Sequence, residues 1–217
     1  MIPAWTAWLC ALWLPFAYVL PSPRVIEQID KARSAKTPVS VRFALEGVDP
    51  TWPAEVRIDL HPVGGLRLDD QQGGRWVVRR GRVVAGSGSE VPAWIPQIEF
   101  LLQPSADTLS SWLEGAGVDL RRNALGRCAA DDCFVLGGRD GAAQLWVDKD
   151  AFQPRIWVSP AGRRFELTDY RSWGKIKFPN KINILDDSGR IASLLTLRVE
   201  PAPQLGADDF SARWTRL

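Results

Sequence analysis

Short runs of alternating apolar and polar residues, joined by short links, recur through most of this 217-residue chain. In residues 39–45 the apolar side chains Val39, Val41, Phe43 and Leu45 stand at every second position, which is the period of a half-buried strand. The same period recurs in Val56-Ile58-Leu60, Leu66-Leu68, Trp76-Val78, Phe134-Leu136, Leu145-Val147, Ile156-Val158, Phe165-Leu167, Ile182-Ile184 and residues 191–199. Because the links are too short for parallel crossovers, neighbouring strands must be antiparallel. The chain is therefore predicted to be mainly β (α+β), an antiparallel sheet of about ten strands that is strongly curved or closed.

Helices are predicted where the alternation stops. Between Pro23 and Ala35 the apolar residues stand at helical spacing, and Glu27, Asp30, Lys31 and Arg33 are placed on the polar side. A second helix is expected from Trp94 to Leu102 and a third from the cap at Ser105 to about Gly115. The segment from Trp94 to Leu102 is apolar on nearly every side, so it must be covered or must cover another apolar surface.

The N-terminal segment predicts export from the cytoplasm. Residues 2–21 carry no charge, and the run from Ala7 to Leu14 is apolar enough for the centre of a signal peptide. Retention as a membrane anchor remains an alternative, because about 20 apolar residues can span a bilayer. Acylation of Cys10, as in a lipoprotein, is a weaker alternative. We therefore expect residues 1–21 to be a signal peptide or anchor, residues 22–217 to form a single domain, and the protein to be periplasmic.

Two cysteines remain beyond the leader, Cys128 and Cys133, separated by four residues. In an exported protein such a pair predicts a disulfide closing a tight loop, although two reduced thiols remain an alternative.

Composition and motifs argue against several classes of function. With 27 basic and 25 acidic side chains the net charge is +2, so the basic surface that nucleic acid requires is not expected. His61 is the sole histidine, it precedes a proline and a glycine pair, and it is interpreted as a solvated turn residue. The acidic pairs fall in expected turns, and Gly86 to Ser89 is interpreted as a flexible loop. We therefore expect no enzyme, no metal site and no cofactor.

Several segments of the second half resemble the LolA-like outer-membrane lipoprotein carrier or lipoprotein-sorting family, the LolA/LolB fold. Residues 144–155, Gln-Leu-Trp-Val-Asp-Lys-Asp-Ala-Phe-Gln-Pro-Arg, resemble a hairpin of that family. Residues 163–170 followed by 176–182 resemble its next segment, with a Phe-Pro turn, and Gly117-Val118-Asp119 with Leu125-Gly126-Arg127 fit divergent members. The resemblance extends over about residues 24–199.

The resemblance implies a half-closed barrel with an N-terminal helix and a helical lid over a hydrophobic cavity. It implies a monomeric periplasmic chaperone that binds lipoprotein acyl chains, or another lipid, and takes them from an inner-membrane exporter to an outer-membrane receptor. The candidate cavity and lid residues are Trp94, Ile95, Ile98, Leu101, Leu102, Phe43, Ile58, Trp76 and Leu145. The alternative that these apolar side chains simply pack on one another stays open.

One departure concerns the lid. Family members have an arginine before a proline at the end of an early strand, and this arginine bonds to the lid, whereas here the place holds His61-Pro62. The candidates for lid gating are therefore His61, Arg57 and Arg67. Two other functions remain open: an envelope-stress sensor with the same fold, and, less favoured, an exported hydrolase.

Overall fold

The computed structural model describes residues 19–33, 39–46, 55–61, 65–70, 73–79, 82–88, 90–91, 94–103, 105–173, 176–201 and 204–216. Most of the expected leader, residues 1–18, thus lies outside the described residues.

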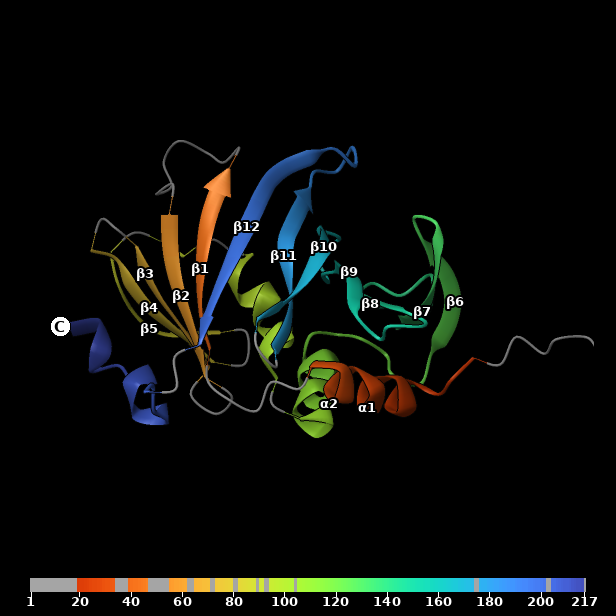
Figure 1. Ribbon diagram of the computed structural model, residues 1–217, viewed down its shortest axis with the longest axis horizontal. Helices are drawn as coiled ribbons and strands as arrows, with labels where there is room; N and C mark the ends of the chain where they lie inside the picture. Colours follow the sequence, from red (N-terminus) through yellow and green to blue (C-terminus); the bar gives the residue numbers. More distant parts are fainter. Residues whose placement is uncertain are drawn as a thin grey trace, which may run out of the picture.

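Twelve strands of the described chain form one continuous antiparallel sheet, in the order β5-β4-β3-β2-β1-β12-β11-β10-β9-β8-β7-β6 (Figure 1). The strands are β1 Val39–Glu46, β2 Glu55–His61, β3 Gly65–Asp70, β4 Arg75–Arg79, β5 Arg82–Ser87, β6 Asn123–Cys128, β7 Asp131–Leu136, β8 Gln144–Asp148, β9 Pro154–Val158, β10 Arg164–Trp173, β11 Ile176–Leu185 and β12 Ile191–Pro201. Because β5 and β6 end the order without pairing to each other, the sheet stays open. The predicted mainly β, antiparallel fold is confirmed, and the sheet is not closed.

The pairing of β12 with β1 joins two meanders. Val39 lies opposite Pro201 and Glu46 opposite Leu194, so the whole length of β1 pairs with the last strand of the sheet. Strands β1 to β5 continue from one side of this pair and β11 back to β6 from the other. The sheet is therefore complete only when residues about 150 to 160 positions apart in the sequence have met.

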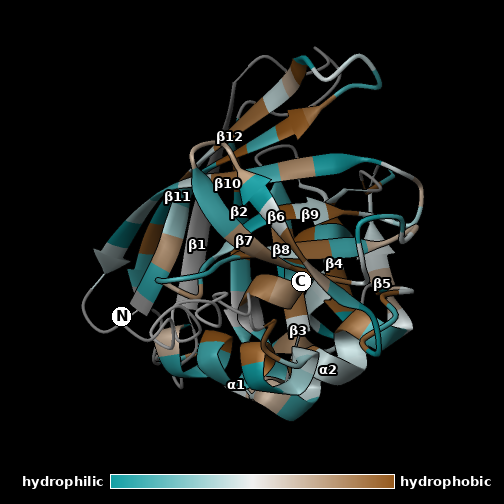
Figure 2. Ribbon diagram, turned by 90° about the vertical axis from the view of Figure 1, so that its right-hand side faces the viewer, coloured by the Kyte–Doolittle hydropathy of each residue, from teal (hydrophilic) through white to brown (hydrophobic). Residues whose placement is uncertain are grey.

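Three helical segments lie on one side of the sheet: α1 Ser22–Arg33, the 3-10 helix η1 Ile95–Leu102 and α2 Ala106–Gly115. Figure 1 shows α1 and α2 side by side below the strands, and Figure 2 shows hydrophobic and hydrophilic bands alternating along α1. The cap predicted for α2 is present, because the backbone N–H of Thr108 donates to the Ser105 hydroxyl at 3.3 Å and the N–H of Ser105 donates to the Thr108 hydroxyl at 3.1 Å.

The main apolar core lies between these helical segments and the sheet. It joins side chains from α1, η1 and α2 to inward-facing side chains of strands β2 to β4 and β7 to β12. A smaller cluster, made of Val77, Leu205 and Phe210 with Ala85 and Trp214, is separate from this core. The C-terminal helices η2 Ala207–Phe210 and η3 Trp214–Arg216 contribute to this second cluster, so they cover another part of the sheet.

Strands β5 and β6 were not predicted, and the expected flexible loop at Gly86 to Ser89 is partly wrong because Gly86 and Ser87 belong to β5. Each of these two edge strands carries a glycine under an indole ring. A Cβ atom on Gly86 would lie 2.4 Å from Trp76, and one on Gly126 would lie 2.4 Å from Trp146. Glycine therefore leaves room for each indole to pack against the edge strand.

Candidate functional site

The apolar segment η1 lies buried in the main core. Trp94, Ile95, Ile98 and Leu101 are all buried, and they share one cluster with Ile58 of β2, Trp76 of β4 and Leu145 of β8. Seven of the nine cavity and lid candidates are thus in one place. The other two, Phe43 of β1 and Leu102 of η1, have side chains outside the described part of the structure.

An aromatic contact connects η1 and α2 to the sheet. The ring centroid of Phe100 lies 5.6 Å from that of Trp112 in α2 and 5.7 Å from that of Trp157 in β9, and the two indoles are 5.4 Å apart. Trp157 is fully buried, and its Nε1 has no hydrogen-bond partner within the described residues. In this state, side chains of the helical segments fill the space over the sheet.

Arg33, the last residue of α1, holds η1 in place. Its Nη1 donates to the backbone oxygen of Phe100 at 3.0 Å, and the residue is only 8% exposed. Burial lowers the pKa of Arg33 to about 10, against the opposing charge of Asp30, so the guanidinium remains cationic at neutral pH. A buried cation therefore bonds directly to the backbone of η1.

The sequence analysis placed Arg33 on the polar side of its helix, and this is wrong. Arg33 follows Ile29 by four residues and Ile29 follows Val25 by four, and all three residues are buried. Residues four apart share a face of a helix, so the spacing itself carried the signal. The spacing was overlooked because a charged residue was expected on the polar face.

The three candidates for lid gating lie elsewhere. Arg57 and Arg67 both donate to the buried carboxylate of Asp59, at 3.0 and 2.9 Å. The Arg67 guanidinium also lies 5.3 Å from the ring centroid of Phe210, and the His61 ring lies 5.5 Å from the same ring. Since alternate residues of a strand point to opposite faces, these side chains face away from Ile58 and its core. The structure places His61 and Arg67 beside the C-terminal helices and Arg57 beside Asp59, whereas Arg33 bonds to η1.

A small pocket opens beside Arg33. Its lining comes from the end of α1, from η1, from the turn after β8 and from strands β10 and β11: Ala32, Arg33, Leu101, Phe152, Gln153, Pro154, Tyr170, Lys177, Phe178 and Pro179. Its volume of about 10 Å³ is room for about one water molecule. The Tyr170 hydroxyl donates to the backbone oxygen of Pro154 at 2.5 Å, and burial raises the pKa of this phenol. The pocket is too small to hold an acyl chain.

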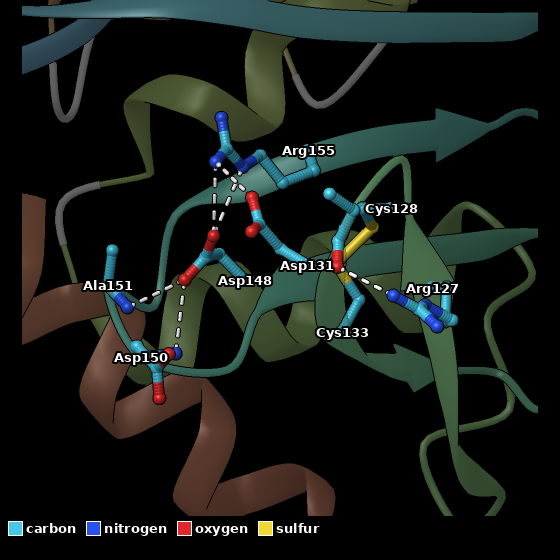
Figure 3. Close-up of polar contacts among 9 residues, drawn as sticks. Arg127, Cys128, Asp131, Cys133, Asp148, Asp150, Ala151 and Arg155 are labelled. Atoms are coloured by element: carbon cyan, nitrogen blue, oxygen red, sulfur yellow. Dashed lines mark hydrogen bonds and ion pairs between the residues drawn. A yellow bond between two sulfur atoms is a disulfide. The ribbon is translucent and has the colours of Figure 1, made fainter.

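The turn after β8, which carries the family resemblance, is fixed by Asp148 (Figure 3). One carboxylate oxygen accepts from the backbone N–H groups of Asp150 and Ala151 at 3.0 and 2.7 Å, and the other accepts from Arg155 Nη2 at 3.1 Å. Arg155 also pairs with Asp131 of the neighbouring hairpin at 3.3 Å. Phe152 and Gln153 of this turn line the pocket, so the network positions one of its walls.

The predicted disulfide between Cys128 and Cys133 is confirmed. It links β6 to β7 next to Asp131 (Figure 3), at the edge of the sheet. Within the described ranges, no group of three His, Cys, Asp or Glu side chains is placed to hold a metal ion. The helices of the described chain include none long and apolar enough to cross a bilayer.

No protein-family model matches the sequence, and no curated protein does. Among solved structures, the LolA superfamily protein NE2245 from Nitrosomonas europaea is similar over 90% of this chain and 99% of its own, with 12% identity and a TM-score of 0.54. The chain has a LolA-like fold. A DUF1329 family protein from Desulfovibrio piger matches less well, with a TM-score of 0.48 at 8% identity over 91% of this chain and 98% of its own. The Pseudomonas aeruginosa MucA/MucB complex has a TM-score of 0.29 at 19% identity, over 89% of this chain and 61% of that one.

Proposed function

We propose that this protein is a periplasmic carrier that shields the acyl chains of lipoproteins, or of another lipid, between η1 and the sheet. It acts without catalysis or a cofactor. The observation that carries the proposal is an apolar lid, η1, that is packed onto the core of a LolA-like fold and pinned there by one buried arginine.

The lid solves a problem that any acyl carrier faces. An exposed acyl chain costs about 0.8 kcal/mol per methylene, on the order of 10 kcal/mol for a long chain, and an empty apolar cavity would be similarly costly. In the closed state, Ile98, Leu101 and Phe100 fill the space themselves. An incoming acyl chain then replaces one set of apolar contacts with another, so that binding is favourable and still reversible.

The bond from Arg33 to Phe100 sets the balance between the closed and open states. A hydrogen bond from a charged group contributes about 1.5–3 kcal/mol, so its loss shifts the lid toward opening without removing the apolar surface that binds lipid. In this proposal, an inner-membrane exporter delivers the lipoprotein and an outer-membrane receptor removes it.

The first experiment measures binding of a synthetic triacylated lipopeptide without net charge to the purified protein, by calorimetry. We expect saturable binding by the wild type, and at least about tenfold tighter binding by Arg33→Met, because the closed state loses the hydrogen bond from Arg33 to Phe100. Arg121→Met is the matched control, since Arg121 lies at the surface with a side chain 91% exposed. Absence of lipopeptide binding by both the wild type and Arg33→Met would rule out an acyl carrier.

Depletion in cells separates the carrier from the alternative role as an envelope-stress sensor. Loss of a carrier leaves lipoproteins at the inner membrane, which fractionation detects. Loss of a sensor changes transcription and leaves lipoprotein sorting intact, and that outcome would overturn the carrier proposal.

A further inference from the structure

We infer that the pocket beside Arg33 is a subsite for an oxyanion, a carboxylate or phosphate, carried by the apolar ligand of this protein. This inference rests on the carrier function, because the oxyanion enters when η1 moves. It names the class of ligand: an anionic amphiphile, bound in preference to a neutral one.

The first observation is the unused edge of a buried guanidinium. The Nη1 group of Arg33 donates to the backbone of η1, while Nε and Nη2 have no hydrogen-bond partner within the described residues. A buried charge is costly unless it is paired, and no carboxylate of the described chain lies within ion-pair distance of Arg33. Two buried donor groups of Arg33 are therefore available for a hydrogen-bond acceptor.

The second observation is which edge is free. Nε and Nη2 form the side of the guanidinium that donates two parallel hydrogen bonds to a carboxylate or phosphate. Elsewhere in this chain, carboxylates take that same edge: Arg121 donates through Nε and Nη2 to the two oxygens of Asp119 at 3.0 and 3.3 Å. Arg171 does so to Asp169 at 3.4 and 2.8 Å. At Arg33 the edge that these carboxylates occupy is the one left without a protein partner.

The third observation is the charge of the pocket. Lys177 of β11, an exposed residue, lines it together with Arg33, and none of the described lining residues is an Asp or Glu. Tyr170 does not compete as a donor, since its hydroxyl donates to Pro154. The remaining walls are largely apolar, from Leu101, Phe152 and Phe178 among others. Two cations on an apolar wall, one of them buried, match an anionic head on an apolar body.

The test compares dodecanoate with its uncharged counterpart monododecanoylglycerol, both below their micelle concentrations, by calorimetry on the intact protein. For the wild type we expect dodecanoate to bind about tenfold tighter than the neutral ligand. In Arg33→Met this ratio should fall to about one, even though lid opening raises the affinity for both ligands. The ratio therefore separates the contribution of Arg33 to binding the anion from its effect on the position of η1.

Lys177→Gln and Lys181→Gln are a matched pair on one exposed side of β11, and they keep the test independent of any effect of Arg33 on folding. We expect the ratio to fall by about two- to threefold in Lys177→Gln, which lines the pocket, and to stay unchanged in Lys181→Gln, which does not.

Inorganic phosphate alone identifies the source of the oxyanion. If phosphate binds in an Arg33-dependent way and blocks dodecanoate, the subsite is confirmed and it also accepts a free anion. If phosphate does not bind while dodecanoate is preferred, the subsite is confirmed as one for a lipid headgroup. Equal binding of dodecanoate and the neutral ligand by the wild type, with no binding of phosphate, overturns the inference and leaves the carrier function standing. Failure of both dodecanoate and the neutral ligand to bind counts against the carrier function instead.

Discussion

Asp148 fixes the turn that forms one wall of the pocket, and its ionisation is linked to the stability of the fold. Burial by itself would raise the pKa of Asp148, but the N–H groups of Ala151 and Asp150 and the charge of Arg155 outweigh it and hold the pKa below its ordinary value. A carboxyl with a lowered pKa stabilises the native state above its unfolded pKa, about 3.9. This contribution is lost as the pH falls through the lower, native pKa.

We therefore expect Asp148→Asn to lower the free energy of unfolding at pH 7 by about 1–3 kcal/mol, because Arg155 loses its buried charge partner. Below about pH 4 the gap between the two proteins should narrow, since the wild type loses the same interaction by protonation. Denaturant unfolding at pH 7 and pH 3 measures both. A gap that is unchanged at pH 3 would show that the carboxylate charge is not the cause.

The residues of the candidate site were predictable where burial follows apolarity. Trp94, Ile98 and Leu145 were selected as apolar side chains facing inward, and they lie in the main core. Arg33 was missed because a charged side chain is ordinarily solvated, so composition outweighed its spacing after Val25 and Ile29. His61 and Arg67 were assigned to the lid from the family pattern, and the alternation of β2 and β3 places them on the other face.

At the scale of elements, the hairpin of β6 and β7 ends the sheet and depends on its disulfide. The bond closes a loop of six residues, which in the chain-entropy model contributes about 2 kcal/mol. We expect a phosphine reductant to lower the stability of the wild type by about that amount and to leave Cys128→Ala/Cys133→Ala unaffected. In the reduced protein, the backbone amides of β6 and β7 should exchange hydrogen faster than those of the other strands. Equal unfolding curves with and without reductant would contradict this.

The strands that were predictable from the sequence are those with a neighbour on both edges and one buried face. The inner strands alternate because one face is buried, and their short links specify antiparallel neighbours. The two strands that escaped prediction, β5 and β6, are the two edges of the sheet. Most of β5 is exposed, including Val83 and Val84, so it has little apolar period to detect.

At the scale of the whole molecule, the pairing of β1 with β12 makes the sheet depend on the last part of the chain. A chain that ends at residue 190 lacks β12 and leaves the edges of β1 and β11 unpaired. We expect it to lack the near-ultraviolet circular dichroism of the native protein and to be digested rapidly by proteases. A chain that ends at residue 203 is the control, because it loses only the segment with η2 and η3 and should keep the fold at reduced stability. A native spectrum from the chain of 190 residues would show that the two meanders fold independently.

The contact between Trp112 and Trp157 gives the molecule an internal optical signal. The two indoles come from α2 and β9, with centroids 5.4 Å apart and planes inclined at 59°, so their electronic transitions are coupled. Coupling of this kind produces a paired positive and negative band in circular dichroism that vanishes when the rings separate. Any movement of α2 away from β9 is thus observable without a label, as the loss of that band.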